Sequence, residues 1–206
     1  MVHFTLFGIP VYIRPSFWVV LAIFGGALSI SSVEDLIYPA LFVIAGFIAI
    51  LSHEMGHALV GRRLGGGQQT IVLELFGGLT SSHGMQLTRG GRALMILAGP
   101  MMTLLLGIIS LWLTWNIVAP VMASHNLDFW DLAISPFTAA LISPKLYILS
   151  CLIMIGEWWT LLNLLPIYPL DGGQLIAQYI RSPRKVFMTG FITAILIGLL
   201  SFQLFH

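Results

Sequence analysis

The chain has 206 residues, of which 58% are hydrophobic and only 8% are charged, and its formal net charge is +1. Soluble domains carry about 25% charged residues, so this composition excludes an ordinary soluble protein and predicts an integral membrane protein in a lipid bilayer. The sequence has no basic stripe interleaved with aromatic residues, which argues against a nucleic-acid partner. Cys151 is the single cysteine, so an internal disulfide is excluded.

The N-terminal stretch, residues 2–13, is rich in β-branched and aromatic residues and is interrupted by Gly8 and Pro10. This pattern predicts one or two short strands near the membrane surface rather than a helix. The apolar residues 16–30 predict a short first spanning helix, and residues 31–35 predict a turn. The chain therefore enters the membrane soon after its N-terminus.

Residues 36–64 predict a second helix, which leads from an apolar run into a His-Glu-x-x-His sequence. On a helix, His53 and His57 lie one turn apart on the same face. This spacing suits two imidazole nitrogens that bind one zinc ion, while Glu54 can reach a metal-bound water. A structural hydrogen-bonded cluster is the alternative. Each ionisable group in a membrane segment costs about 2.5 kcal/mol or more, so the setting favours metal binding.

Residues 68–83 predict a β-hairpin, because they are rich in β-branched residues and contain Gly77-Gly78 at a turn or bulge. Apolar strands beside a membrane helix must pair with each other, line a cavity, or accept a strand from a partner. The alternative is a surface hairpin that only connects two helices. Glu74 and His83 are potential further ligands, but as loop residues we expect them to be solvated.

Two further helices are predicted in the second half of the chain, at residues 90–118 and 144–162, with an interfacial segment at 119–143 between them. The first of the two contains Ala98-Gly99-Pro100, whose small residues allow close helix packing. The second contains Glu157, an ionisable residue inside an apolar run.

A second polar motif follows, in which Pro166 and Pro169 break the helix before Asp171-Gly-Gly. Irregular backbone at membrane depth is tolerated only where it is buried in protein or lines a cavity. Asp171 is therefore a candidate third metal ligand, which would complete a His-His-carboxylate site with one open position. The alternative is an N-cap for a helix at 172–181. The stretch alone leaves both open, and its combination with the histidine helix favours the ligand.

Residues 186–205 predict a last spanning helix, which gives about five transmembrane helices at roughly 20 residues per span. The predicted fold is thus an all-α polytopic membrane protein with a small membrane-associated β-sheet or hairpin. Residues 1–206 are expected to form a single membrane-embedded domain.

The charges of the loops predict an orientation in the cell membrane by the positive-inside rule, with the N-terminus in the cytoplasm. Counting about 1.5 Å per residue from Arg62, His57 lies roughly 8 Å and His53 roughly 14 Å from the cytoplasmic face. The predicted cytoplasmic segments contain Arg14, Arg62, Arg63, Arg89, Arg92, Arg181, Arg184 and Lys185. The predicted outer segments contain Glu34, Asp35, Asp128, Asp131 and a single base, Lys145.

The two polar motifs together make the chain resemble the site-2 proteases, a family of zinc intramembrane metalloproteases. The family pattern is a His-Glu-x-x-His helix and a later Asn-x-x-Pro-x-x-Pro-x-Asp-Gly segment, which stand here at 53–57 and 163–172. The resemblance covers nearly the whole chain, because three weaker segments also match the family: Phe7–Val11, Phe76–Gly78 and Ala98–Pro100.

The resemblance implies that His53, His57 and Asp171 bind zinc and that Glu54 is the catalytic base. It also implies that Asn163 holds the substrate backbone or helps to stabilise the oxyanion, and that the hairpin pairs with an unwinding substrate segment. No inserted PDZ domain or appended CBS domain is expected within these residues.

Two positions depart from the family pattern or lie outside it. Thr103 stands where the family often has asparagine, which leaves the polar contact there open. Glu157 belongs to no motif, and a hydrogen-bonded position in the bundle interior is favoured over a catalytic role.

The function expected from the sequence is intramembrane endoproteolysis of single-pass transmembrane proteins, such as membrane-tethered regulators. The alternatives are a non-enzymatic membrane zinc transporter, a zinc-dependent scaffold, and an inert substrate-binding relative. A transporter favours polar groups that are distributed along a path through the bilayer, whereas the ligands here cluster beside a base. The sequence carries no signal for an oligomeric state.

Overall fold

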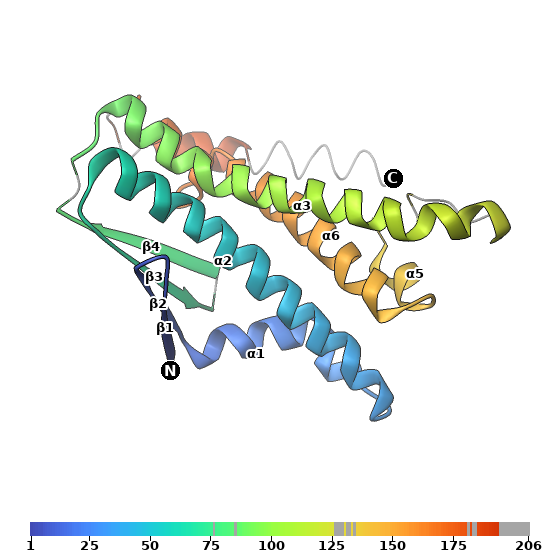
Figure 1. Cartoon of the computed structure of the whole chain (residues 1–206). Helices are drawn as coiled ribbons and strands as arrows, with labels where there is room; N and C mark the ends of the chain where they lie inside the picture. Colours follow the sequence, from blue (N-terminus) through green and yellow to red (C-terminus); the bar gives the residue numbers. More distant parts are fainter. Residues whose placement is uncertain are drawn as a thin grey trace.

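The computed structural model describes residues 1–75, 77–84, 86–125, 130, 133, 135–180, 182 and 185–193. Long helices lie side by side, and a small β-sheet packs beside one end of the helical layer (Figure 1). Several positions considered in the sequence lie outside the described residues: Phe76, Asp128, Asp131, Arg181, Arg184 and 194–206.

Within the described residues, three helices are long and apolar enough to cross a membrane, and they match the helices predicted at 36–64, 90–118 and 144–162. They pack against one another in all three pairs. Their bounds are Ile37–Gly65 for α2, Arg89–His125 for α3 and Pro144–Leu164 for α6. The 3₁₀ turn η2 (Glu34–Leu36) precedes α2, and the short helix α5 (Pro136–Ala140) precedes α6. The polytopic helical fold is therefore confirmed.

The first helix, α1, is shorter than predicted and covers only Pro15–Phe24. It ends at Gly25-Gly26, where Gly26 has a φ of +88° in the left-handed region that favours glycine, and the 3₁₀ turn η1 (Ala27–Ser29) follows. Ten residues of helix extend about 15 Å, which is half of the hydrocarbon thickness. Residues 185–193 are helical, at the start of the predicted last span. The count of about five spans stays a prediction.

The predicted N-terminal strands and hairpin are confirmed, and they join into one four-stranded sheet in the order β1-β2-β3-β4. The strands are β1 (Val2–Leu6), β2 (Ile9–Ile13), β3 (Gln68–Glu74) and β4 (Gly77–His83). β1 pairs antiparallel with β2, β2 pairs parallel with β3 through Val11 and Ile71, and β3 pairs antiparallel with β4. Gly77-Gly78 opens β4 instead of forming the turn. Within the described part of the chain, β4 is thus an edge strand.

One face of the sheet packs on α1 and on the C-terminal half of α2. Alternate residues of the two central strands are buried there, as the period of two predicts. The buried residues of this core are Ile9, Val11, Ile13, Phe17, Leu21, Ile50, Met55, Ala58, Ile71 and Leu73. This core fixes the sheet against the part of α2 that carries the two histidines.

A buried polar pair joins α3 to α6. Thr103, where the family often has asparagine, is fully buried, and its Oγ1 donates to the carbonyl of Pro100 at 3.0 Å. The same oxygen lies 2.8 Å from Oγ1 of Thr160. Threonine therefore satisfies the polar contact that was left open at this position.

Candidate metal centre

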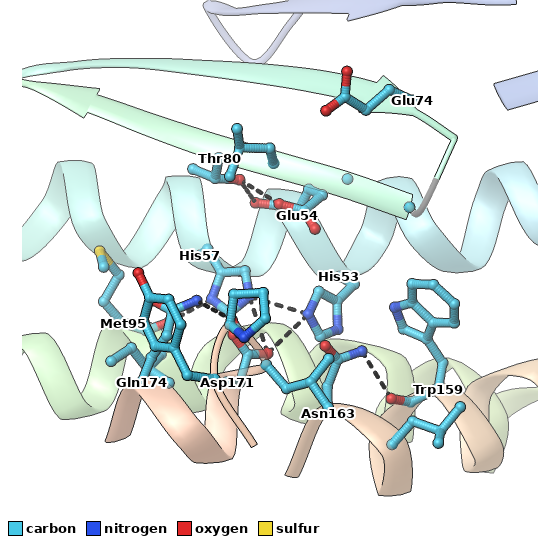
Figure 2. Close-up of a pocket in the computed structure, with 18 residues that line it drawn as sticks. His53, Glu54, His57, Glu74, Thr80, Met95, Trp159, Asn163, Asp171 and Gln174 are labelled. Carbon is cyan, nitrogen blue, oxygen red and sulfur yellow. Dashed lines mark hydrogen bonds and ion pairs between the residues drawn. The ribbon is translucent and has the colours of Figure 1, made fainter. Parts of the chain in front are cut away.

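Two segments that are far apart in the sequence bring three ligand-type side chains together. His53 and His57 come from α2, and Asp171 comes from the first turn of α7 (Asp171–Ala177). The two Nε2 atoms lie 3.1 Å apart, and Oδ2 of Asp171 lies 3.0 Å from Nε2 of His53 and 3.3 Å from Nε2 of His57 (Figure 2). All three residues are buried, and they could hold a metal ion.

The donor atoms of this triangle fit a tetrahedral divalent ion. Zinc–ligand distances of about 2.0–2.1 Å place tetrahedral ligands roughly 3.3 Å apart, close to the observed separations. Nδ1 of His57 lies 2.8 Å from the carbonyl of Met95, which as an acceptor fixes the Nδ1–H tautomer and leaves the Nε2 lone pair for a metal. Oδ2 of Asp171 is buried and receives no well-directed hydrogen bond. A cation between these atoms would satisfy them.

Two glycines let α2 and α3 approach closely at the metal centre. A Cβ on Gly56 would overlap the backbone carbonyl of Ala98, and a Cβ on Gly99 would overlap Nε2 of His57 and lie 2.8 Å from Nε2 of His53. The Ala98-Gly99-Pro100 segment therefore forms one wall of the metal centre. The small residues of this segment predicted close helix packing. They did not indicate that the segment packs against the histidine pair.

The chain reaches Asp171 through the irregular segment between α6 and α7. The N-cap of α7 is Leu170, which makes no side-chain capping bond, so Asp171 is the first helical residue and not the cap. A Cβ on Gly172 would overlap the carbonyl of Leu164, so only glycine lets α7 fold back against the end of α6. The N-cap alternative is thus not supported, and α7 is shorter than the helix predicted at 172–181.

Glu54 lies between the histidine pair and β4 (Figure 2). It is buried, and its Oε2 accepts a hydrogen bond of 2.7 Å from Oγ1 of Thr80. The prediction from sequence missed Thr80. Strand periodicity places Gly78 and Thr80 on one face of β4, but it does not say which helix that face meets.

A cleft of about 550 Å³ contains all five residues that the sequence predicted for the site. Asn163 lies on the opposite wall from β4 and donates from Nδ2 to the carbonyl of Trp159 at 2.9 Å. Its second N–H and its Oδ1 have no partner among the described residues. The cleft is lined by His53, Glu54, His57, Glu74, Gly77, Gly78, Leu79, Thr80, Met95, Ile96, Trp159, Leu162, Asn163, Tyr168, Pro169, Leu170, Asp171 and Gln174.

Three other ionisable residues lie outside the metal centre. Glu74 lines the cleft but forms an ion pair of 2.9 Å with Arg14. His83 is exposed, as expected. The prediction that Glu157 lies in the bundle interior is wrong: it is exposed, because α6 turns Ile153, Gly156 and Thr160 inward instead. Within the described part of the chain, His53, His57 and Asp171 are the one group of three ligands.

Comparisons with known proteins place the chain in a family. The pattern of Peptidase family M50 matches residues 41–204. A zinc metalloprotease of Methanocaldococcus jannaschii is 27% identical over 174 residues, which cover 84% of this chain and 43% of that protein. A putative zinc metalloprotease of Synechocystis sp. is 29% identical over 188 residues, which cover 85% and 43%. The chain thus spans less than half the length of both relatives.

The fold is also similar to a solved structure, that of a site-2 protease from Methanocaldococcus jannaschii. The TM-score is 0.61 at 24% sequence identity, and the match covers 99% of this chain and 87% of that one. Because the family match covers most of the chain, the resemblance seen in the sequence is confirmed. This chain belongs to peptidase family M50, the site-2 protease family of zinc metalloproteases.

Proposed function

We propose that the chain is a zinc-dependent intramembrane endopeptidase that cleaves the transmembrane segments of single-pass membrane proteins, such as membrane-tethered regulators. One observation carries the proposal: the buried carboxylate of Glu54 stands beside a three-ligand metal centre in a cleft whose wall is an edge strand. Family membership and the names of the relatives agree with it. Residues 1–206 act in it as one membrane-embedded domain.

His53, His57 and Asp171 would hold the zinc ion through two imidazole nitrogens and one carboxylate oxygen. Three protein ligands are the usual number in catalytic zinc sites, which keep their fourth position for water or substrate. A bound zinc ion supplies Lewis acidity, which polarises a carbonyl and lowers the pKa of a bound water to near 7.

The remaining chemistry belongs to two side chains of the cleft. Glu54 accepts the proton of the attacking water and delivers it to the leaving amine, as a general base and then a general acid. Asn163 holds the substrate backbone or helps to stabilise the oxyanion through the amide group that its bond to Trp159 leaves partly unused.

The edge strand β4 offers a place for the substrate. A transmembrane helix hides its peptide bonds in internal hydrogen bonds, so a substrate must unwind locally before it is cut. Pairing of the unwound segment with β4 would replace the lost backbone hydrogen bonds. β4 lines the same cleft as Glu54 and the metal ligands, so a strand added there runs past the reactive groups.

The site lies near the cytoplasmic face of the cell membrane in our proposal, and the N-terminus is cytoplasmic. The basic residues Arg62, Arg63, Arg89 and Arg92 lie at the ends of α2 and α3 that flank the sheet, while Glu34 and its neighbour Asp35 lie at the opposite end of α2. This distribution follows the positive-inside rule. An N-terminal epitope tag should be digested by protease in inside-out vesicles and protected in intact spheroplasts, and the reverse pattern would contradict the orientation.

The test of the activity is cleavage of a single-pass reporter substrate by the purified protein in liposomes. Glu54→Gln should lower the rate by at least about 100-fold, the contribution of a general base, while the zinc content per chain stays unchanged. Glu157→Gln is the matched control, since it makes the same substitution at an exposed residue, and it should cleave normally. Full activity of the Glu54→Gln protein would refute the assignment.

No observation favours the alternative of a zinc transporter. The described residues form one three-ligand group and not a series of sites along a path. Zinc flux into proteoliposomes tests this directly, and we expect none above the rate of empty vesicles.

A further inference from the structure

The carboxylate of Glu54 is held from one side by the edge strand β4. Oγ1 of Thr80 lies 2.7 Å from Oε2 of Glu54 and 3.1 Å from its backbone carbonyl oxygen, so its single O–H has two acceptors on this residue and the carboxylate oxygen is the nearer one. A hydrogen bond to an ionised carboxylate is about twice as strong as one between neutral groups. A glutamate side chain has three rotatable bonds, and this contact selects one of its conformations.

Gly78 brings the strand into direct contact with the same carboxylate. A Cβ at this position would lie 2.5 Å from Cδ and 2.6 Å from Oε1 of Glu54, so no side chain fits between the strand and the glutamate. Gly78 and Thr80 are two residues apart and therefore lie on the same face of β4. Glu54 is thus enclosed by the strand at two points.

The backbone of the same two residues faces the free edge of the sheet. The carbonyl of Leu73, the register partner of Gly78, accepts a hydrogen bond of 2.9 Å from the backbone N–H of Arg14, so Leu73 and Gly78 are not a hydrogen-bonded pair of the β3–β4 ladder. Hydrogen-bonded and non-hydrogen-bonded pairs alternate along an antiparallel ladder. The Leu73–Gly78 and Ile71–Thr80 pairs are therefore both non-hydrogen-bonded. The N–H and C=O groups of Gly78 and Thr80 point away from β3.

We propose that Thr80 is a positioning residue that couples docking of the substrate strand on β4 to the orientation of Glu54. The inference rests on the proposed proteolytic function. A substrate strand paired with the backbone of Thr80 holds this residue from the open side. Because threonine is stiff at χ1, fixing its backbone also fixes the direction of its hydroxyl. The base is then held in one conformation when the substrate is in place.

The decisive variant is Thr80→Val, which keeps the shape of the side chain and removes the hydroxyl. We expect kcat to fall by about 10- to 100-fold, the range for loss of one hydrogen bond to a charged group. KM should change by less than about threefold, because the backbone that binds the substrate is unchanged. Thr80→Ser keeps the hydroxyl but lacks the β-branch that stiffens χ1, so it should recover part of the kcat that Thr80→Val loses.

Thr70→Val is the matched control. Thr70 lies in β3, is the register partner of Ser81, and belongs to the opposite face of the sheet from Ile71 and Thr80. The substitution is the same and lies in the same hairpin, so it reports any general effect on the sheet. We expect wild-type kcat for this variant.

A readout other than turnover uses the Glu54→Gln background. There, Thr80→Val should leave the zinc content and the affinity for a fluorescent single-pass substrate in nanodiscs unchanged. Three results would overturn the inference: wild-type kcat in Thr80→Val, equal loss in Thr80→Ser and Thr80→Val, or a loss confined to KM and substrate affinity. The proposed function fails separately, through activity of the Glu54→Gln protein.

Discussion

Gly99→Ala is the sharpest test of the metal centre, because it changes the centre without touching a ligand. A Cβ at residue 99 would lie 2.8 Å from Nε2 of His53 and would overlap Nε2 of His57. Ordinary contacts of a Cβ begin at 3.4 Å, so the imidazole of His53 or the backbone of α3 must move by at least about 0.6 Å. Metal–ligand distances tolerate only about 0.2 Å.

The expected result is a loss of zinc affinity of at least about tenfold, the lower end of the range for changes outside the ligands themselves. A shift of α3 would remove the steric overlap only by disturbing His57 in another way, because Met95 on the same helix accepts the hydrogen bond from Nδ1 of His57. Affinity is measured by competition with a chromophoric chelator, and zinc content by mass spectrometry of the metal. Cleavage activity should fall with occupancy and return in part at high zinc concentration.

Gly107→Ala is the control for this prediction. It makes the same substitution further along α3, where a Cβ would meet nothing within 4 Å. This variant should bind zinc like the wild type, and alanine should stabilise the helix by up to about 1 kcal/mol. If Gly99→Ala bound zinc with unchanged affinity, the Nε2 atoms of His53 and His57 would not lie against residue 99, and the arrangement of the ligands described above would be refuted.

Three further predictions concern the same cleft. Asp171→Ala should reduce the zinc bound per chain, whereas Asp35→Ala, in the 3₁₀ turn before α2, should not; unchanged stoichiometry would move the third ligand elsewhere. Gly78→Ala should keep its zinc but lose at least about tenfold in kcat because its Cβ displaces the Glu54 carboxylate, and normal turnover would contradict the contact. Thr103→Val should cost about 0.5–1.5 kcal/mol of stability by removing the hydrogen bond between the two hydroxyls, since Thr160 keeps the carbonyl of Pro100 at 3.3 Å as an acceptor; we expect a lower melting temperature, and an unchanged one would argue against the pair.

The parts of the site that depend on local spacing were accessible from the sequence. The period of the α-helix alone places His53 and His57 on one helix face. The His-Glu-x-x-His spacing then makes Glu54 the candidate that can reach a metal-bound water. Asp171 was favoured as the third ligand by its combination with the histidine helix, but its distance from the two imidazoles depends on how α7 lies relative to α2. The N-terminal strands and the hairpin were predicted from composition, while their union through Val11 and Ile71 was not, since it links residues distant in the chain.

Side-chain partners across elements were not accessible in the same way. Glu157 was assigned to the interior because α6 is apolar all round, so its sequence has no polar face that marks the outside. The contact of Thr80 with Glu54 depends on how β4 packs against α2. The early end of α1 at Gly25-Gly26 was visible in the sequence, yet the apolar residues beyond it hid the break.

The parallel pairing of β2 with β3 has a mechanical consequence for the histidine helix. Because α1 and α2 lie between these two adjacent strands in the chain, they form a loop whose two ends are hydrogen-bonded into a single sheet. Glu54 lies inside this loop, so the segment that carries it is anchored to the sheet at both ends. Asp171, by contrast, lies outside the loop, so the cleft joins a segment anchored in the sheet to one that, within the described residues, belongs to no strand pair.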